Sequence, residues 1–398
     1  MSTATSKESV FSSSSRAEVF REVTALLASG VEDGVYPGAV LIIGKNGEEL
    51  FRGAVGFKSL RVNKGEEALP MTADTVFDIA SLTSVVGVAT LVMRLAQSGR
   101  LKLEDKIVRY IDGFSVYGKS GISIAHLLSH TSGLAHWVPF YEELVKENSS
   151  SRMGILTSRG ARDYVVNSIV RSQLKFAPGQ KQMYSDLGLI LLGRLCEVLT
   201  GLSLDKAVMQ FVLQPLGMKN TSYVDLSMIK RRGIHPVKGL IAPTEDCPWR
   251  KRILWGEVHD DNAWAMGGIA GHSGLFSTAP DVHIFAAQML AASRGQSEFL
   301  PAEIVRGFWH AVERDQDTSW QYGWDTPSHE NGMSESKLSP EAVGICGFTG
   351  CSLWIEPESG IDIVLMTNRV HPSRSNKKIR TFRPQLYDAA LEAAARCR

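Results

Sequence analysis

Strand-like segments at opposite ends of the chain constrain the fold most. Residues 38–57 read GAVLIIGKNGEELFRGAVGF, in which two apolar runs flank Asn46-Gly47, the strongest short signal for a hairpin turn. Residues 347–368 read GFTGCSLWIEPESGIDIVLMTN and indicate two further strands joined by a turn at 357–360. The two ends therefore have to form one sheet, and the long middle of the chain is an insertion.

Helical periodicity flanks these strands. Apolar residues recur at helical spacing over 16–29, and the apolar stretch 82–98 is typical of a buried helix. A last helix is predicted over 385–396, directly after Pro384. The pattern predicts a two-lobe α/β (α+β) fold, with an antiparallel sheet flanked by helices and a mostly helical second lobe.

The domain organisation follows from the same pattern. The serine-rich residues 1–15 are expected to form a disordered tail. We place the α/β lobe at about 16–115 and 270–398 and the helical lobe at about 116–270, within a single domain that spans 16–398. A cleft between two lobes is a common place for a binding site.

Composition excludes several classes of function. The formal net charge is +1 and no block of Lys and Arg occurs, so nucleic acid is not an expected partner. No apolar run reaches the length of a membrane span, and the first residues lack the apolar core of a secretory signal. The five cysteines show neither zinc nor disulfide spacing. We therefore expect a cytoplasmic protein with reduced thiols and with no metal or cofactor.

The segment FDIASLTS, residues 77–84, places Ser81 just before the apolar helix. Asp78 to Ser81 is compatible with a helix N-cap, because Ser and Asp side chains accept hydrogen bonds from free N–H groups. The same position also suits a nucleophile, because a helix N-terminus favours a developing oxyanion. Both interpretations stay open at this point.

Two further motifs are weak when taken alone. Tyr184 lies in FAPGQKQMYSDLGLILLG, residues 176–193, just before an apolar helix. It is either a packed ring with a solvated hydroxyl or a base toward Ser81. The glycines of GICGFTG, residues 344–350, either let the backbone approach a ligand closely or mark a bulge.

Together, Ser81, Tyr184 and the glycine-flanked strand follow the order of the motifs in serine β-lactamases and penicillin-binding proteins. The chain most resembles the class C β-lactamase-related hydrolases and esterases, and the resemblance covers nearly the whole chain from about residue 17. Other stretches that resemble this family are HLLSHTSGL (126–134), MGGIAGHSGLFSTAPD (266–281) and GFTGCSLWIEP (347–357). The resemblance implies that Ser81 forms an acyl-enzyme and that Tyr184 assists it.

The chain departs from this family at both cationic positions. The Ser-x-x-Lys motif ends in Ser84 instead of Lys, and the third motif opens with Ile345 instead of Lys or His. The second motif, Tyr184-Ser185-Asp186, is a Tyr-x-Asp variant of Tyr-x-Asn. A serine hydroxyl needs a base, and a tyrosine becomes one only when nearby positive charge favours its phenolate. The resemblance therefore implies a degenerate site that is weak or inactive.

The remaining site residues are assigned from the same motifs. Residues expected to contact a ligand are Asp186, Cys346, Gly347, Phe348 and His272. The loss of the cation and hydroxyl of the third motif predicts an apolar corner at Ile345 and Cys346, which favours neutral esters or amides over β-lactams.

Five residues are candidates to replace the missing cations. His272 has a side chain whose ordinary pKa suits a base, although a histidine that holds a loop is the simpler interpretation. Arg369 and His371 follow the last strand, and Lys175 and Lys181 flank the tyrosine motif. None of them restores a base one helical turn beyond the nucleophile.

The sequence thus predicts a β-lactamase-related serine hydrolase of the esterase or amidase type, acting on a small ester, amide or peptide-like ligand. The alternative is a non-catalytic pseudo-hydrolase that binds a ligand or a protein partner. A penicillin-binding carboxypeptidase or β-lactamase comes third, because both cations and a signal peptide are missing.

Overall fold

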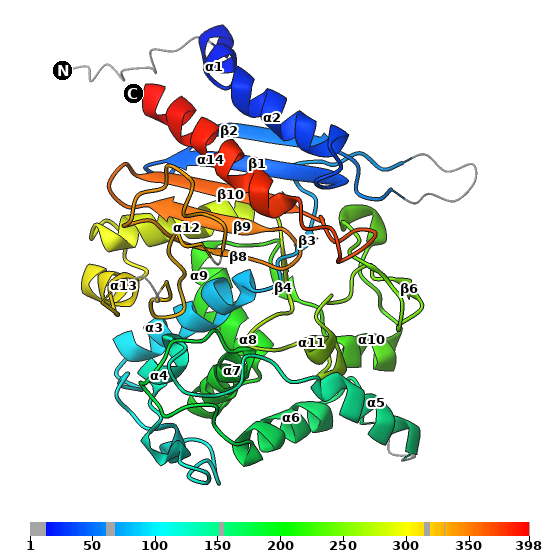
Figure 1. Ribbon diagram of the computed structural model, residues 1–398, viewed down its shortest axis with the longest axis vertical. Coiled ribbons are helices and arrows are strands. Elements are labelled where there is room, and N and C mark those ends of the chain that lie inside the picture. Colours follow the sequence, from blue (N-terminus) through cyan, green and yellow to red (C-terminus); the bar gives the residue numbers. More distant parts are fainter. Residues whose placement is uncertain (1–12, 61–67, 151–154, 314–318, 330, 398) are drawn as a thin grey trace, which may run out of the picture.

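A five-stranded antiparallel sheet, built from both ends of the chain, forms one side of the molecule (Figure 1). The structure is a computed structural model that describes residues 13–60, 68–150, 155–313, 319–329 and 331–397. The strand order is β2-β1-β10-β9-β8. The bounds are β1 Gly38–Lys45, β2 Glu48–Gly56, β8 Val343–Cys346, β9 Ser352–Glu356 and β10 Ile361–Thr367. Because β1 pairs with β10, the prediction that the two ends form one sheet is confirmed.

The turn between β1 and β2 has the predicted chemistry. Asn46 has φ 53° and Gly47 has φ 84°, and a two-residue hairpin turn of this kind needs positive φ at both positions. Side chains of β1 alternate between two cores, as the pleat of a strand requires. Leu41 and Ile43 belong to one core, whereas Val40 and Ile42 belong to the other.

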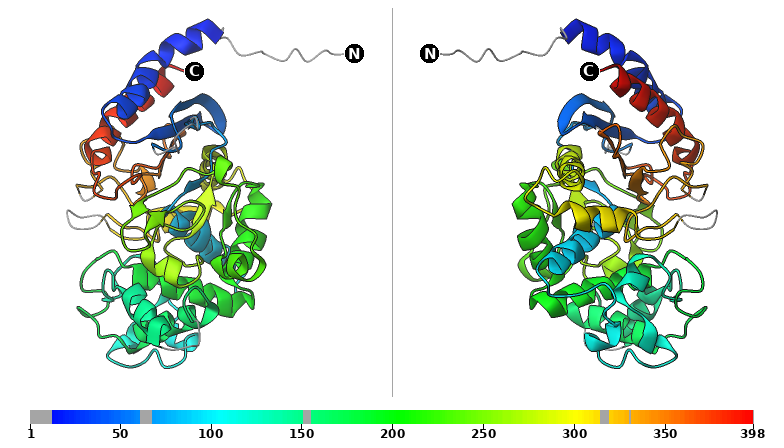
Figure 2. Two further views of the ribbon diagram at one scale, coloured as in Figure 1. Left: turned by 90° about the vertical axis from the view of Figure 1, so that its right-hand side faces the viewer. Right: turned by 90° about the vertical axis from the view of Figure 1, so that its left-hand side faces the viewer.

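Helices cover both faces of the sheet. On the outer face α2 (Arg21–Glu32) and α14 (Ile379–Arg396) lie side by side against the strands (Figure 2). On the inner face α12 (Ala279–Ser293) contacts β1, β9 and β10. The inner core continues from there into the helical part of the molecule.

The middle of the chain is mostly helical and lies below the sheet in Figure 1. Its α-helices are α4 Ile124–Leu128, α5 Phe140–Ser150, α6 Arg159–Arg171, α7 Asp186–Thr200, α8 Leu204–Val208, α9 Gln214–Leu216, α10 Leu226–Arg232 and α11 Asp261–Ala265. Two further helices pack beside them, α3 Thr90–Gln97 and α13 Ala302–Trp309. Shorter 3₁₀ and π turns are η1 Ser84–Ala89, η2 Ile107–Arg109, η3 Lys119–Gly121, η4 Met209–Leu213 and η5 Lys238–Leu240. Two small sheets comprise β3 Phe77–Asp78, β7 Leu275–Ser277 and β4 Ser222–Tyr223, and β5 Asp246–Cys247 with β6 Arg252–Ile253.

Some predicted boundaries differ from the structure. The helix predicted over 16–29 is two helices, α1 (Ser13–Val19) and α2, so α1 begins inside the predicted tail 1–15, most of which lies outside the described residues. The last helix begins at Ile379 and contains Pro384. The predicted lobe boundaries stay a prediction.

The helix predicted over 82–98 begins with the π-helical turn η1. The Thr90 hydroxyl donates to the Val85 carbonyl five residues earlier at 2.7 Å, which accommodates the wider turn. A side-chain bond of this kind is invisible in a hydrophobic pattern.

None of the described helices is by itself long and apolar enough to cross a membrane. The pair Asp186–Thr200 and Leu204–Leu216 reaches that length only jointly, and it is bent by 75°.

Candidate active site

Ser81 lies in a turn between β3 and the buried helix. The preceding residue, Ala80, has φ +46°, which residues with a Cβ seldom adopt. Asp78 holds this turn, because its Oδ1 accepts a hydrogen bond from the Ala80 N–H at 2.9 Å and its Oδ2 accepts one from the His259 N–H at 2.7 Å. Unfavourable backbone conformations fixed in this way cluster at functional sites.

Ser84 lies one helical turn beyond Ser81 and is almost fully buried. Its hydroxyl donates to the Ser81 carbonyl oxygen at 2.8 Å, and its N–H donates to the same oxygen at 3.0 Å. The hydroxyl is therefore engaged with the backbone rather than with the Ser81 side chain. A proton acceptor for Ser81 is not supplied from this position.

Tyr184 packs its ring among three aromatic side chains. The ring centroids of His130, Trp320 and His136 lie 4.7, 4.9 and 5.6 Å from its own. The Tyr184 hydroxyl is buried and makes no fully formed hydrogen bond within the described part of the chain. Burial and then the Asp186 carboxylate raise the pKa of Tyr184 well above its ordinary value, although the nearby Ser81 hydroxyl opposes the shift. The phenol is therefore neutral at neutral pH.

His272 forms a buried ion pair close to Tyr184. Its Nε2 lies 2.9 Å from Asp260 Oδ1. Burial opposes a charged imidazole, but the carboxylates of Asp260 and Asp186 outweigh burial and raise the pKa of His272 to about 9. Burial also opposes a charged Asp260, yet His272 lowers the pKa of that carboxyl to about 2. At neutral pH His272 is already protonated, so it is a cation and not a base.

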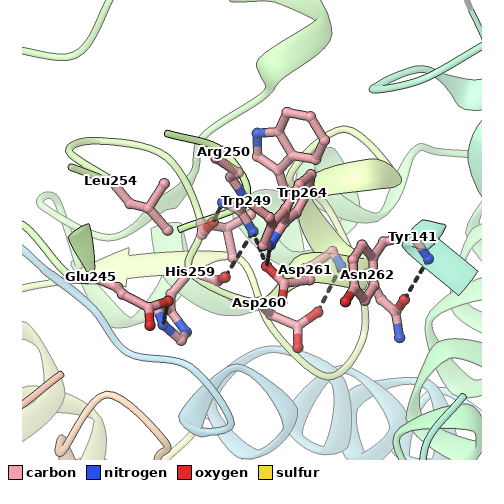
Figure 3. A network of polar contacts seen from close by, with 12 residues as sticks. Tyr141, Glu245, Trp249, Arg250, Leu254, His259, Asp260, Asp261, Asn262 and Trp264 are labelled. Atoms are coloured by element: carbon pink, nitrogen blue, oxygen red, sulfur yellow. Dashed lines mark hydrogen bonds and ion pairs between the residues drawn. The ribbon is translucent and has the colours of Figure 1, made fainter. Parts of the chain in front are cut away.

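A polar network holds the segment that carries Asp260 (Figure 3). Arg250 Nη2 donates to Asp261 Oδ1 at 2.6 Å and to the His259 carbonyl at 2.9 Å. The His259 ring lies 3.3 Å from a Glu245 carboxylate oxygen. Asp260 itself accepts a hydrogen bond from the first turn of α11 at 2.7 Å. These contacts fix the position of the Asp260 carboxylate before any ligand binds.

Two adjoining hollows of about 300 Å³ each meet at Ser81, and we call them together the cleft. The carboxylate hollow is lined by Ala80, Ser81, His136, Trp137, Tyr184, Asp186, His259, Asp260, Asp261, His272, Ser273, Phe348 and Arg374. The arginine hollow is lined by Ser81, His136, Tyr184, Trp320, Asp325, Asn331, Cys346, Gly347, Phe348, Arg369, Arg374, Lys377, Ile379, Arg380 and Arg383.

The cleft brings most of the sequence-predicted site residues together. Residues of that set that line at least one hollow are Ser81, Tyr184, Asp186, His272, Cys346, Gly347 and Phe348. Ser84 and Ile345 line neither hollow, and Ile345 is buried in the inner core. Of the replacement cations, Arg369 lines the arginine hollow, whereas His371, Lys175 and Lys181 line neither.

The predicted apolar corner at the third motif is wrong. Cys346 and Gly347 face a hollow that five cationic side chains line, and four of the five were not predicted. The side chains come from the turn after β10 and from the start of α14, which only the tertiary structure brings beside β8. The run SRSNKKIR, residues 373–380, was the available signal, because it is unusually rich in Arg and Lys after the last strand.

Other residues of the carboxylate hollow were also missed. Asp260 and Asp261 belong to HDDN, residues 259–262, a run in which every side chain is able to form hydrogen bonds or ion pairs. The high density of hydrogen-bonding and ionisable side chains in this run was the available signal for a functional site. Trp320, which lines the arginine hollow and packs on Tyr184, was also missed and carried no comparable pattern.

The fold is that of the β-lactamase class of serine hydrolases. The sequence profile of the Beta-lactamase family matches residues 23–387, so the chain belongs to that family. The family resemblance seen in the three motifs is thereby confirmed.

Relatives in this family have several activities. The chain is 30% identical over 375 residues to an N-acetylmuramyl-L-alanine amidase of Bacillus subtilis (strain 168), covering 88% of this chain and 81% of that protein. The structure resembles EstCE1, a hydrolase with promiscuous acyltransferase activity, with TM-score 0.71, 20% identity, and 95% and 100% of the two chains covered. It also resembles Simvastatin Synthase (LovD) from Aspergillus terreus, with TM-score 0.71, 16% identity, and 94% and 98% covered. At such identities the two structures show the shared fold alone.

Proposed function

We propose that the cleft is a serine hydrolase site in which Ser81 accepts the acyl group of an ester or amide slowly, because no strong base serves it. One observation carries the proposal. Ser81 and the Tyr184 phenol share the cleft, while the hydroxyl of Ser84 is directed to the Ser81 carbonyl. Under this proposal Ser81 is the nucleophile beside Tyr184, and Ser84, at the position of the family lysine, offers it no base.

The chemistry requires a destination for the Ser81 proton. The Ser81 oxygen forms a bond to the acyl carbon, the bond to the leaving oxygen or nitrogen breaks, and the proton passes to that leaving group. Tyr184 is neutral and His272 is protonated, so neither accepts the proton readily. Ser81, Tyr184 and Asp186 line the same hollow, so the residual path is one in which Tyr184 takes the Ser81 proton while it passes its own proton to Asp186.

Stabilisation of the oxyanion does not depend on the missing lysine. The backbone N–H groups of Ser81 and Phe348 donate no hydrogen bond to a carbonyl in the described part of the chain. Both residues line both hollows. We assign these two N–H groups as the oxyanion donors, and such donors support a residual rate when a base is absent.

The test is covalent labelling with a fluorophosphonate, read by intact-mass spectrometry. We expect slow, stoichiometric modification at Ser81 and none in Ser81→Ala. Hydrolysis of p-nitrophenyl acetate is expected to be slow and equally dependent on Ser81. Rapid turnover by the native protein would contradict the proposal, because another group would then be acting as the base.

A second candidate is ligand binding without turnover. It is favoured by Arg369, Arg380 and Arg383 of the arginine hollow, which form no ion pair with a described residue and need no proton transfer to bind a ligand. Folded protein that is neither labelled nor active on esters points to this function.

A further inference from the structure

We propose that a groove beside α10 binds a single-chain carboxylate, with the alkyl chain on an apolar floor and the head group at a basic rim. This α10 groove has a volume of about 490 Å³ and is bordered by α10, β4 and residues 234–241 (Figure 1). None of its lining residues lines either hollow at Ser81. The groove is therefore a site separate from the one that carries the proposed function.

Large apolar side chains are exposed at the edge of the α10 groove. Ile234, Val237 and Leu240 are 69%, 66% and 56% exposed, and all three line the groove. Single exposed apolar side chains are normal on a protein surface, but a group of them around one hollow is typical of a binding site. The volume also falls within the roughly 300–1,000 Å³ of small-molecule sites.

The floor of the groove is apolar and lies below the surface. Ile241 and Phe276 line it and are only 5% and 3% exposed. A flat lipid surface does not reach side chains at this depth, whereas an alkyl chain that enters the groove does. Met228 and Ile229 of α10 add further apolar lining. Each methylene that such a chain buries strengthens binding about fourfold.

The rim of the groove is basic. Lys219 and Arg232 line it, are exposed, and form no ion pair with any residue that the structure describes. Arg232 ends α10, whose last turn also contains Lys230 and Arg231. A carboxylate head group accepts charge-assisted hydrogen bonds from such side chains.

The acidic residue of the lining, Asp225, does not neutralise this rim. Its Oδ1 accepts hydrogen bonds from the Ser227 N–H at 2.8 Å, the Ser227 hydroxyl at 2.6 Å and the Met228 N–H at 3.1 Å. The carboxylate thus caps the first turn of α10, about 10 Å along the helix axis from Arg232. Charge complementarity therefore favours an anionic head group over a cationic one.

Main-chain bonds fix the side of the groove that carries Leu240. The Val76 N–H donates to the Leu240 carbonyl at 2.9 Å, and the Ala242 N–H donates to the Val76 carbonyl at 2.9 Å. The Trp255 Nε1 donates to the Ile241 carbonyl at 2.8 Å. The groove is therefore formed before a ligand binds, which lowers the entropy cost of binding.

The test is titration calorimetry on the native protein with decanoate below its critical micelle concentration. We expect saturable binding. Hexanoate is four methylenes shorter and should bind at least tenfold more weakly, because it buries less apolar surface. Decyltrimethylammonium has the same alkyl chain with a cationic head group, and it should also bind at least tenfold more weakly.

Two pairs of matched variants locate the site. Val237→Asp places a negative charge at the apolar edge and should weaken decanoate binding at least tenfold, whereas Val116→Asp changes an exposed valine outside the groove and should have no effect. Arg232→Gln should weaken binding about threefold, the usual worth of an exposed ion pair. Arg231→Gln, at a residue of α10 outside the lining, should leave it unchanged. All four positions are exposed, so the variants are expected to fold.

The proposal is overturned if decanoate does not bind saturably, if the ammonium probe binds as tightly, or if a control variant weakens binding as much as its counterpart. Loss of decanoate binding in Arg380→Gln but not in Val237→Asp would place the ligand in the cleft and overturn it as well. Sedimentation with vesicles of phosphatidylcholine and phosphatidylglycerol tests the other occupant. Vesicle binding that Val237→Asp abolishes, without binding of free decanoate, would identify a membrane surface instead.

Fluorophosphonate labelling separates this site from the cleft. The rate at which Ser81 is labelled should be the same with and without saturating decanoate, and a blocked reaction would place the ligand in the cleft. Decanoate binding by a protein whose Ser81 is never labelled would reject acyl transfer and keep the α10 groove as a site. Labelling without decanoate binding would do the reverse.

Discussion

The two hollows that meet at Ser81 hold their charges in opposite ways. In the carboxylate hollow Asp260 faces His272, and Asp261 faces Arg250 and Arg374. In the arginine hollow Arg369, Arg380 and Arg383 form no ion pair with any residue that the structure describes. Charges that are paired within the protein fix a structure, whereas charges left unpaired on a concave surface provide for a ligand. The same cleft therefore has one half whose charges are paired and one half in which three arginines have no ion-pair partner.

The largest expected loss of stability comes from breaking the ion pair between Arg250 and Asp261 at the carboxylate hollow. Arg250 is buried and bonded to Asp261, so Arg250→Gln leaves that carboxylate with one of its two cationic partners missing. We expect a loss of about 3 kcal/mol in the free energy of unfolding, at the lower end for a broken buried pair because Arg374 remains. Urea denaturation measures it. Lys337→Gln, which removes an exposed ion pair with Glu392, is the control and is expected to change nothing measurable.

The pH dependence of stability tests the charge pair between His272 and Asp260 in the carboxylate hollow. The folded pKa of His272 is raised to about 9 from an ordinary value of 6.5, so its stabilising contribution is complete below pH 6.5 and is lost as pH rises toward 9. The slope from this one group is at most about 1.4 kcal/mol per pH unit. Asp260, whose folded pKa is about 2, contributes above its ordinary pKa of 3.8 and loses that contribution as pH falls toward 2.

Denaturation curves between pH 6 and pH 9.5 check this expectation. In Asp260→Asn the loss of stability between pH 6.5 and 9 is expected to be smaller than in the native protein. The amide retains the hydrogen bond to the first turn of α11, so that helix cap is preserved. An unchanged slope in the variant would show that the His272 charge is not held by Asp260.

A lysine at Ser84 tests the missing base. Ser84→Lys places an amine one helical turn from Ser81, where it would favour the Tyr184 phenolate or take the proton itself after burial lowers its pKa. We expect p-nitrophenyl ester hydrolysis to rise on the order of 10², the usual worth of general-base assistance. Ser81→Ala/Ser84→Lys should stay at background. A variant that folds well but gains no rate would place the defect elsewhere in the cleft.

The smallest expected effect on stability belongs to the arginine hollow. Arg380→Gln should change the free energy of unfolding by no more than about 0.5 kcal/mol without added anion, because no ion pair is lost and repulsion with its neighbours is relieved. Urea denaturation beside Arg250→Gln makes the comparison direct. A large loss of stability from Arg380→Gln would mean that the arginines of this hollow stabilise the fold instead of being available to a ligand.

Local patterns predicted much of the fold. The hairpin around Asn46-Gly47 and the strands of 347–368 were predictable, because turn residues and short apolar runs act over a few positions. The break between α1 and α2 and the π turn after Ser81 were not, because they depend on tertiary packing and on side-chain bonds such as that of Thr90. The order of motifs similarly predicted that Ser81 and Tyr184 lie in one cleft, while the cations near Cys346 were missed.

The sequence by itself determined the sheet, the family and the position of Ser81, the candidate nucleophile, with Ser84 in place of the family lysine. Each of these depends on neighbouring residues or on motif order. Only the tertiary structure decided which charges are paired. His272 is a cation because it is buried against Asp260 and Asp186, and Arg380 faces the cleft because α14 starts beside β8. Burial and partners that are distant in the sequence set the protonation and pairing of a charged group. Neither burial nor such partners can be predicted from the residues adjacent to that group in the sequence.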